Sequence, residues 1–178
     1  MRLFLISILT VFCMTSSAQT ESVKVFHKTE YINGNFYRQL SDTIKTESEN
    51  IDIYFLRRHF FSPYNLPEKF TDHQRKNKTI SVWHDPNGKK DYQQNWKNTY
   101  TYDSFGRVTN YTYSGCFICS NLPYNYTVTY NSIGQVDRIF NTINTKDEYK
   151  FYYDNKGDII KFEEYFGEKL EKVIELVD

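Results

Sequence analysis

Short stretches of alternating hydrophobic and polar residues fill the chain from residue 80 onward, and each stretch ends at a turn signal. Three of them align without gaps around a glycine, at residues 100–108, 128–136 and 151–159. Each has aromatic or β-branched residues two positions apart, then Tyr, Asp or Asn, two variable residues, Gly, one variable residue and Val or Ile. Alternation at a period of two is typical of a half-buried strand. The pattern therefore predicts a repeated β-hairpin, which we call the hairpin motif.

The Asp/Asn-x-x-Gly core of this motif is explained by backbone chemistry. Asp or Asn at the first corner of a type I turn can accept a hydrogen bond from the backbone two residues later. Gly at the fourth position adopts a positive φ and forms the bulge that restores the strand twist. We therefore interpret these Asp, Asn and Gly residues as structural and do not count them as a functional site.

Two further turns extend the pattern. Residues 85–88 (Asp-Pro-Asn-Gly) predict a type I turn, and Asn33-Gly34 between aromatic residues predicts a two-residue hairpin. The glycines at positions 88, 106, 134 and 157 are 18, 28 and 23 residues apart. Two strands with two turns need roughly 20 residues, so successive motif turns are expected at one edge of a sheet. The longest interval predicts an insertion, which we place at residues 114–124.

These observations predict an all-β fold: an antiparallel up-and-down meander of repeated hairpins with about eight to ten strands. The sheet is expected to curl into a partial barrel or to carry residues 19–79 across one face. Residues 51–56 alternate and predict a strand, whereas residues 62–79 allow a short helix or a loop. Residues 168–177 favour a strand closed by Gly167, with a helix as the alternative.

The first eighteen residues have the organisation of an export signal. Arg2 gives a positive start, residues 3–14 are almost continuously apolar, and Ser16-Ser17-Ala18 offers small residues for cleavage. The apolar run of about twelve residues is shorter than the roughly 20 needed to cross a bilayer. Cys13 suggests lipid attachment, but bulky Phe12 precedes it. We expect export to the periplasm, cell surface or medium, without membrane insertion, and a single mature domain over residues 19–178.

Composition and charge narrow the partners. The chain is 18% aromatic, mostly Tyr and Phe, which suits pleated sheet better than helix. Removing Arg2 from the 22 basic residues leaves 21 against 22 acidic ones, a net charge of −1. Binding to nucleic acid or anionic lipid would need a basic patch, so neither is an expected partner.

The Tyr-x-Tyr-Asp-x-x-Gly-Arg-Val run at residues 100–108 resembles the YD repeat of the Rhs (rearrangement hot spot) family. The two later copies are similar to degenerate members, with Asn131 for Asp and Gln135 or Asp158 for Arg. The resemblance covers residues 80–166 and implies a hairpin architecture in a secreted or cell-surface context. In the large members, dozens of repeats form a hollow β-shell that encloses a toxin, and carbohydrate binding has been suggested for the repeats. Three or four repeats cannot close such a shell.

Cys116 and Cys119 form the sharpest local feature outside the motif. A thioredoxin-type pair would begin a helix, but a turn-like Ser-Asn-Leu-Pro sequence follows, and a zinc site needs about four ligands. We expect a small structural disulfide, which requires the four residues to turn so that the Cα atoms lie within about 7 Å. Free thiols and a redox or metal role are the alternatives.

The remaining candidates are aromatic. Asp72-His73 and His84-Asp85 are adjacent only in sequence, so we interpret both pairs as surface residues and predict no catalytic residue, metal site or cofactor. A row of rings beside the first two motif turns could stack on sugars, although half the rings of a repeat sheet must form its core. The candidate binding residues are Trp83, Tyr92, Trp96, Tyr111 and Tyr113.

The leading hypothesis for function is an exported, non-enzymatic binding module for carbohydrate or a cell-surface protein. The alternatives are a small secreted hydrolase, which would need convergent carboxylates or a His beside a nucleophile, and an accessory piece of a larger repeat or toxin system.

Overall fold

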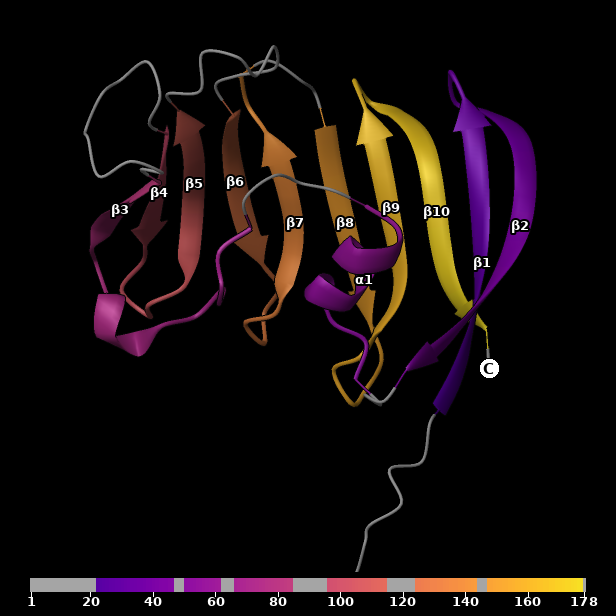
Figure 1. Cartoon of the computed structure of the whole chain (residues 1–178), viewed down its shortest axis with the longest axis horizontal. Coiled ribbons are helices and arrows are strands. Elements are labelled where there is room, and N and C mark those ends of the chain that lie inside the picture. The colour runs from indigo at the N-terminus through magenta and orange to yellow at the C-terminus, as the bar shows by residue number, and fades with distance from the viewer. Residues whose placement is uncertain are drawn as a thin grey trace, which may run out of the picture.

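The computed structural model describes residues 22–46, 50–61, 66–84, 96–114, 124–143 and 147–177. Within these residues, ten antiparallel strands form one sheet in the order β2-β1-β10-β9-β8-β7-β6-β5-β4-β3 (Figure 1). The strands are β1 (Ser22–Ile32), β2 (Asn35–Thr46), β3 (Thr79–His84), β4 (Trp96–Tyr102), β5 (Val108–Ser114), β6 (Tyr124–Tyr130), β7 (Val136–Asn141), β8 (Asp147–Tyr153), β9 (Ile159–Phe166) and β10 (Lys169–Val177). The predicted up-and-down antiparallel meander is confirmed.

All three copies of the hairpin motif form the expected turn. Their glycines have positive φ angles of 82°, 87° and 93° at Gly106, Gly134 and Gly157. The strand register shifts just before each turn, as a bulge requires. The three turns lie at one end of the sheet, between β4 and β5, β6 and β7, and β8 and β9 (Figure 1).

The first turn residue organises its turn through its side chain. Asp103 Oδ1 accepts hydrogen bonds from the amides of Phe105 at 2.9 Å and Arg107 at 2.8 Å. Asn131 and Asp154 bind the equivalent amides of their own turns. In the first two copies the residue after the glycine matches the first residue in chemistry: Arg107 pairs with Asp103 at 2.8 Å, and Gln135 accepts from the Asn131 amide at 3.0 Å. In the third copy Asp158 instead accepts from the amide of Ile51 at 3.2 Å. The difference between the first two copies is therefore coordinated within each turn.

The first and last strands of the described chain pair with each other inside the sheet. β10 pairs with β1 from Val25↔Val177 to Glu30↔Lys172, so residues 169–177 form a strand, as favoured from the sequence. The β1–β2 hairpin turns at Asn33 and Gly34, both with positive φ, as predicted. Because β2 and β3 are the outer strands of the order and do not pair with each other, the sheet is curled but not closed. The expected curled sheet is therefore open at both edges. Residues 22–46 add two strands to this sheet and do not cross its face.

The strand predicted at residues 51–56 is wrong, because α1 (Ile53–His59) forms there. The side chain of Asp52 caps the helix by accepting from the amide of Phe55 at 2.7 Å. Ile53, Phe55 and Leu56 are buried against the sheet, and the Phe55 ring lies 5.7 Å from that of Phe26. Tertiary burial and one cap therefore override the alternating pattern.

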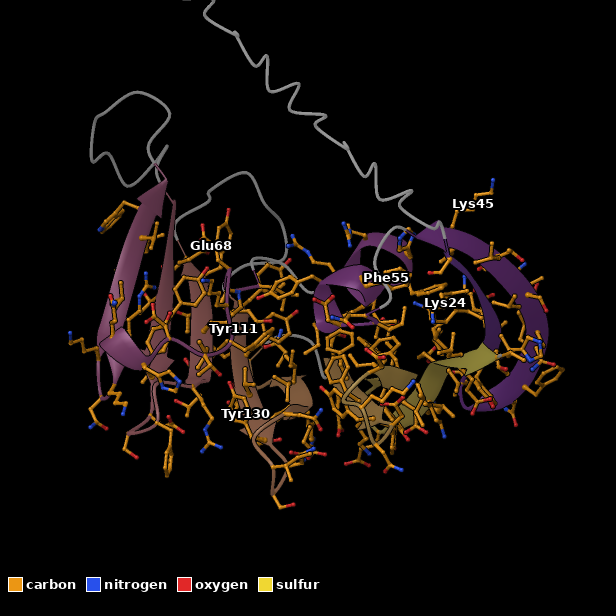
Figure 2. All side chains as sticks on the ribbon, turned by 90° about the horizontal axis from the view of Figure 1, so that it is seen from below. Lys24, Lys45, Phe55, Glu68, Tyr111 and Tyr130 are labelled. Atoms are coloured by element: carbon orange, nitrogen blue, oxygen red, sulfur yellow. The ribbon has the colours of Figure 1, made fainter. Side chains whose placement is uncertain are left out.

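Helix α1 and the segment that follows it cross the concave face of the sheet. We call this segment, of which residues 60–61 and 66–78 are described, the crossing segment. The core beneath it is largely aromatic. Figure 2, seen along the strands, shows Phe55 of α1 on the same side as Tyr111. Tyr100, Tyr111 and Tyr126 lie directly opposite one another on β4, β5 and β6. The rings of Tyr111 and Tyr126 stack at 5.0 Å. This core holds the crossing segment against the sheet.

The part of the crossing segment after residue 66 is extended until a single 3₁₀ turn at His73–Arg75. No helix starts at Pro67, so of the two alternatives the loop is observed for the described residues 66–72. The predicted turn at residues 85–88 and the insertion at 114–124, apart from Ser114 and Tyr124, lie outside the described residues, as does the leader. Across the described ranges, no helix is long and apolar enough to cross a membrane.

Candidate functional site

A cleft of about 510 Å³ lies between the crossing segment and the concave face of β3 and β4. One wall comes from α1 and the following segment, and the floor comes from the sheet. Its lining residues are Arg57, Leu66, Pro67, Glu68, Lys69, Asp72, Arg75, Val82, Asn98, Tyr100 and Tyr102. The volume is in the range of small-ligand sites.

The wall is fixed to the first hairpin motif by backbone hydrogen bonds. The amide of Asp72 donates to the carbonyl of Gly106 at 2.7 Å, and the amide of Val108 donates to the carbonyl of Phe70 at 2.9 Å. A Cβ at position 106 would lie 2.4 Å from the carbonyl oxygen of Asp72. Glycine is therefore needed here for close approach as well as for its φ angle.

The floor consists of buried polar side chains. Tyr100, Tyr102 and Asn98 are 8%, 4% and 5% exposed. Burial raises the pKa of Tyr100, and its hydroxyl shares a hydrogen bond with the Asn98 side chain that lowers this pKa. The Tyr102 hydroxyl accepts from Arg75 Nη1 at 3.0 Å. Because so little of either ring is exposed, the floor presents polar edges instead of a stacking surface.

Asp72 and Arg75 hold the lower end of the cleft together. Asp72 caps the 3₁₀ turn by accepting from the amide of Gln74 at 3.0 Å, and its second oxygen pairs with Arg75 at 2.9 Å. Both carboxylate oxygens of Asp72 are thus engaged within the wall.

The rim carries three charged side chains that are exposed. Arg57 comes from the last turn of α1, and Glu68 and Lys69 from the crossing segment. None of the three forms a hydrogen bond or ion pair with another described residue. Figure 2 places Glu68 on the concave side of the sheet, as it does Tyr111. Among the described residues, two cations and one carboxylate on this rim are therefore without an ion-pair partner and can contact a ligand.

A second hollow of about 540 Å³ lies beside the β1–β2 and β9–β10 turns. Its charges are largely paired: Glu30 binds Lys28 at 2.7 Å and also Arg38, and Lys172 binds Glu164 at 2.5 Å. The cleft beneath the crossing segment is the stronger candidate because its rim charges have no partner within the described chain.

The candidate aromatic residues do not form one exposed row. Val82, Asn98 and Tyr113 are register neighbours on the concave face, whereas Trp83 and Lys97 are neighbours on the opposite, outer face. The ring of Trp83 is 37% exposed, with Lys97 Nζ 5.2 Å from its centroid.

Tyr111 is only 1% exposed and belongs to the core, so it cannot present its ring to a ligand. Tyr113 is half-buried on the same face, with its ring 6.3 Å from that of Tyr124. The sequence prediction of one aromatic platform that includes Trp83, Tyr111 and Tyr113 is therefore corrected. Trp83 lies on the outer face, Tyr113 on the concave face, and Tyr111 in the core.

The other sequence candidates lie partly or wholly outside the described residues. These are Tyr92, the side chain of Trp96, Cys116 and Cys119, so the expected disulfide stays a prediction. Of the two His-Asp pairs, His73 is exposed and its Nδ1 lies 3.0 Å from the carbonyl oxygen of Phe105. Asp72 lines the cleft, whereas the sequence alone suggested an ordinary surface residue. The described residues contain no group of three or more His, Cys, Asp or Glu arranged to hold a metal ion.

Sequence reasoning missed the cleft because its residues come from three separate parts of the chain. The only available signal was the charged, proline-containing stretch at residues 66–75, for which the sequence allowed both helix and loop. No family model matches the chain, and comparison with curated proteins and with solved structures likewise found no match. The resemblance to YD repeats therefore remains a prediction carried by the hairpin motif.

Proposed function

We propose that this is an exported, non-enzymatic binding module whose cleft takes an acidic oligosaccharide, one carrying carboxylate or sulfate groups. The observation that carries the proposal is the pair of exposed cations, Arg57 and Lys69, on the rim of a polar cleft; neither forms an ion pair with another described residue. Arg binds carboxylates and sulfates through charge-assisted, often bidentate hydrogen bonds.

A sugar fits this cleft better than an apolar ligand. The floor offers tyrosine hydroxyls and an amide, and Glu68 on the rim can accept hydrogen bonds from sugar hydroxyls. The apolar contribution is small, since it comes from Leu66, Pro67 and Val82. Recognition would therefore depend on charge and hydrogen bonds, with affinity that falls as salt rises.

Export and the repeat architecture agree with this function. The leader at residues 1–18 would carry the chain to the periplasm, cell surface or medium, where polysaccharides with carboxylate groups are accessible ligands. The resemblance of the hairpin motif to YD repeats, for which carbohydrate binding has been suggested, points the same way.

A secreted hydrolase is the rival, and the specific observation in its favour is that two carboxylates, Glu68 and Asp72, line the same cleft. Glycoside hydrolysis uses two carboxylates in separate roles. Against this rival, both oxygens of Asp72 are held by Gln74 and Arg75, and a catalytic carboxylate would need one free for the reaction.

A glycan array with acidic and neutral oligosaccharides tests the proposal. We expect retention of uronate-containing or sulfated oligosaccharides and no retention of their neutral counterparts. Each retained oligosaccharide is then incubated with the protein and analysed by mass spectrometry. Intact ligand supports a binding module, and shortened ligand would establish the hydrolase. If no acidic oligosaccharide on the array is retained, the proposal is contradicted.

A further inference from the structure

The outer strand β2 has a long regular stretch whose far edge is unpaired within the described chain. It stands at the end of the strand order, and its register with β1 is uninterrupted from Glu30↔Arg38 to Ser22↔Thr46. Proteins usually protect such an edge, because its amides and carbonyls can pair with another strand. The opposite edge strand, β3, has only six residues.

The residues along this stretch are arranged for an antiparallel copy of the same strand. Arg38, Leu40 and Asp42 lie on one face, opposite Glu30, Lys28 and Phe26 of β1. Leu40 is 42% exposed, so its apolar side chain is available to a partner. Asp42 forms no ion pair with any other described residue.

We propose that two copies of this protein associate through β2, with Leu40 on the twofold axis. In this register Leu40 faces the partner's Leu40, and Arg38 of each copy faces the partner's Asp42. One apolar contact and two opposite-charge pairs form, all on one face of a continuous sheet. Arg38 binds Glu30, its register neighbour on β1, through Nε, and its Nη groups can donate to the partner's carboxylate across the free edge.

Neighbouring registers are less favourable, which makes this pairing specific. Moving the axis by one residue, to Ser41, places Leu40 opposite the partner's Asp42. Moving it by two residues places the two Asp42 carboxylates opposite each other, where like charges repel. Only the Leu40-centred register combines the apolar contact with both charge pairs.

Cysteine cross-linking distinguishes this register from any other. Residues directly opposite in an antiparallel pair have Cα atoms about 4.5–5.5 Å apart, which suits a disulfide. Leu40→Cys is therefore expected to give a covalent dimer under mild oxidation. Thr43→Cys is the matched control on the same strand, because its two copies would lie about 20 Å apart. The wild-type chain, with Cys116 and Cys119, gives the background.

Sedimentation velocity over a range of concentrations measures the association itself. We expect a reversible dimer for the exported chain. Asp42→Lys should weaken it at least about tenfold, because both charge pairs become repulsive. Asp137→Lys, the same change at an exposed position of β7, should leave the dimer unchanged. A monomer at every concentration, open-ended assemblies from β2 pairing with β3, or equal cross-linking of Leu40→Cys and Thr43→Cys would each overturn the proposal.

Discussion

The hydroxyl of Tyr153 donates a 2.6 Å hydrogen bond to the carbonyl of Val136, which begins the strand after the preceding motif turn. Tyr130 makes the same contact one repeat earlier, with the carbonyl of Val108 at 2.8 Å. The tyrosine of one hairpin motif therefore binds the valine of the motif before it. This contact explains why tyrosine, and not another aromatic residue, stands before Asn131 and Asp154; in the first copy the Tyr102 hydroxyl accepts from Arg75 instead.

Removing these hydroxyls should destabilise the fold. Tyr130→Phe and Tyr153→Phe each leave a carbonyl without its tyrosine donor, so each should lower the free energy of unfolding by about 1–2 kcal/mol in urea titrations. Tyr37→Phe is the control, because Tyr37 is exposed on β2, and it should change stability by less than about 0.5 kcal/mol. Equal effects of all three changes would contradict a role for the hydroxyls.

The pairing between the Asp or Asn of the turn and the residue after its glycine predicts coupled mutations in the first motif. Asp103→Asn and Arg107→Gln should each destabilise by about 0.5–1 kcal/mol, because each breaks the ion pair. The double change reproduces the Asn131–Gln135 pair of the second motif and should recover part of the loss. A double-mutant cycle measures this coupling, and strictly additive losses would contradict the proposed matching.

Two glycines with nearly the same φ angle should respond differently to alanine. Gly134→Ala pays only for the positive φ, about 1–2 kcal/mol, because open space surrounds its Cβ position. Gly106→Ala also forces the new methyl against the carbonyl of Asp72, so it should cost at least about 1 kcal/mol more. Thermal or urea unfolding of both variants measures the difference, and similar losses would mean that the crossing segment is not held against Gly106.

The aromatic core predicts unfolding in alkali. Burial raises the pKa values of Tyr111, Tyr126 and Tyr149 above their usual value. The unfolded chain ionises at about pH 10, so the contribution of these groups to stability is complete below that pH and decreases as the pH rises through the folded pKa values. Tyrosinate absorbance and circular dichroism should therefore change together above about pH 10. Full ionisation of the tyrosines with native circular dichroism would contradict the burial.

The hairpins were predictable because each is determined locally. The Asp103-x-x-Gly106 sequence, its two later copies and Asn33-Gly34 specify their turns by side-chain caps and positive φ angles, which depend on few distant residues. The same holds for the strand at residues 169–177, where Gly167 closes the hairpin.

The helix and the cleft were not predictable because they depend on distant parts of the chain. Ile51, Ile53 and Phe55 alternate as a strand does, yet their burial under the curled sheet and the cap from Asp52 produce a helix. The pairing of β1 with β10 brings together segments that share no sequence signal. The sequence pattern alone does not show which face each ring occupies, so it groups Trp83 with Tyr113 although they lie on opposite faces.

The most direct test of the binding function is calorimetric titration with the acidic oligosaccharide retained on the array. We compare the wild type, the double variant Arg57→Ala/Lys69→Ala and the control Lys156→Ala, whose cation lies on the third motif turn away from the cleft. We predict that the double variant keeps its fold but weakens binding at least about tenfold, as expected for two charge-assisted contacts, while Lys156→Ala binds like the wild type. Unchanged affinity in a folded double variant, or equal losses in both variants, would contradict the cleft as the binding site.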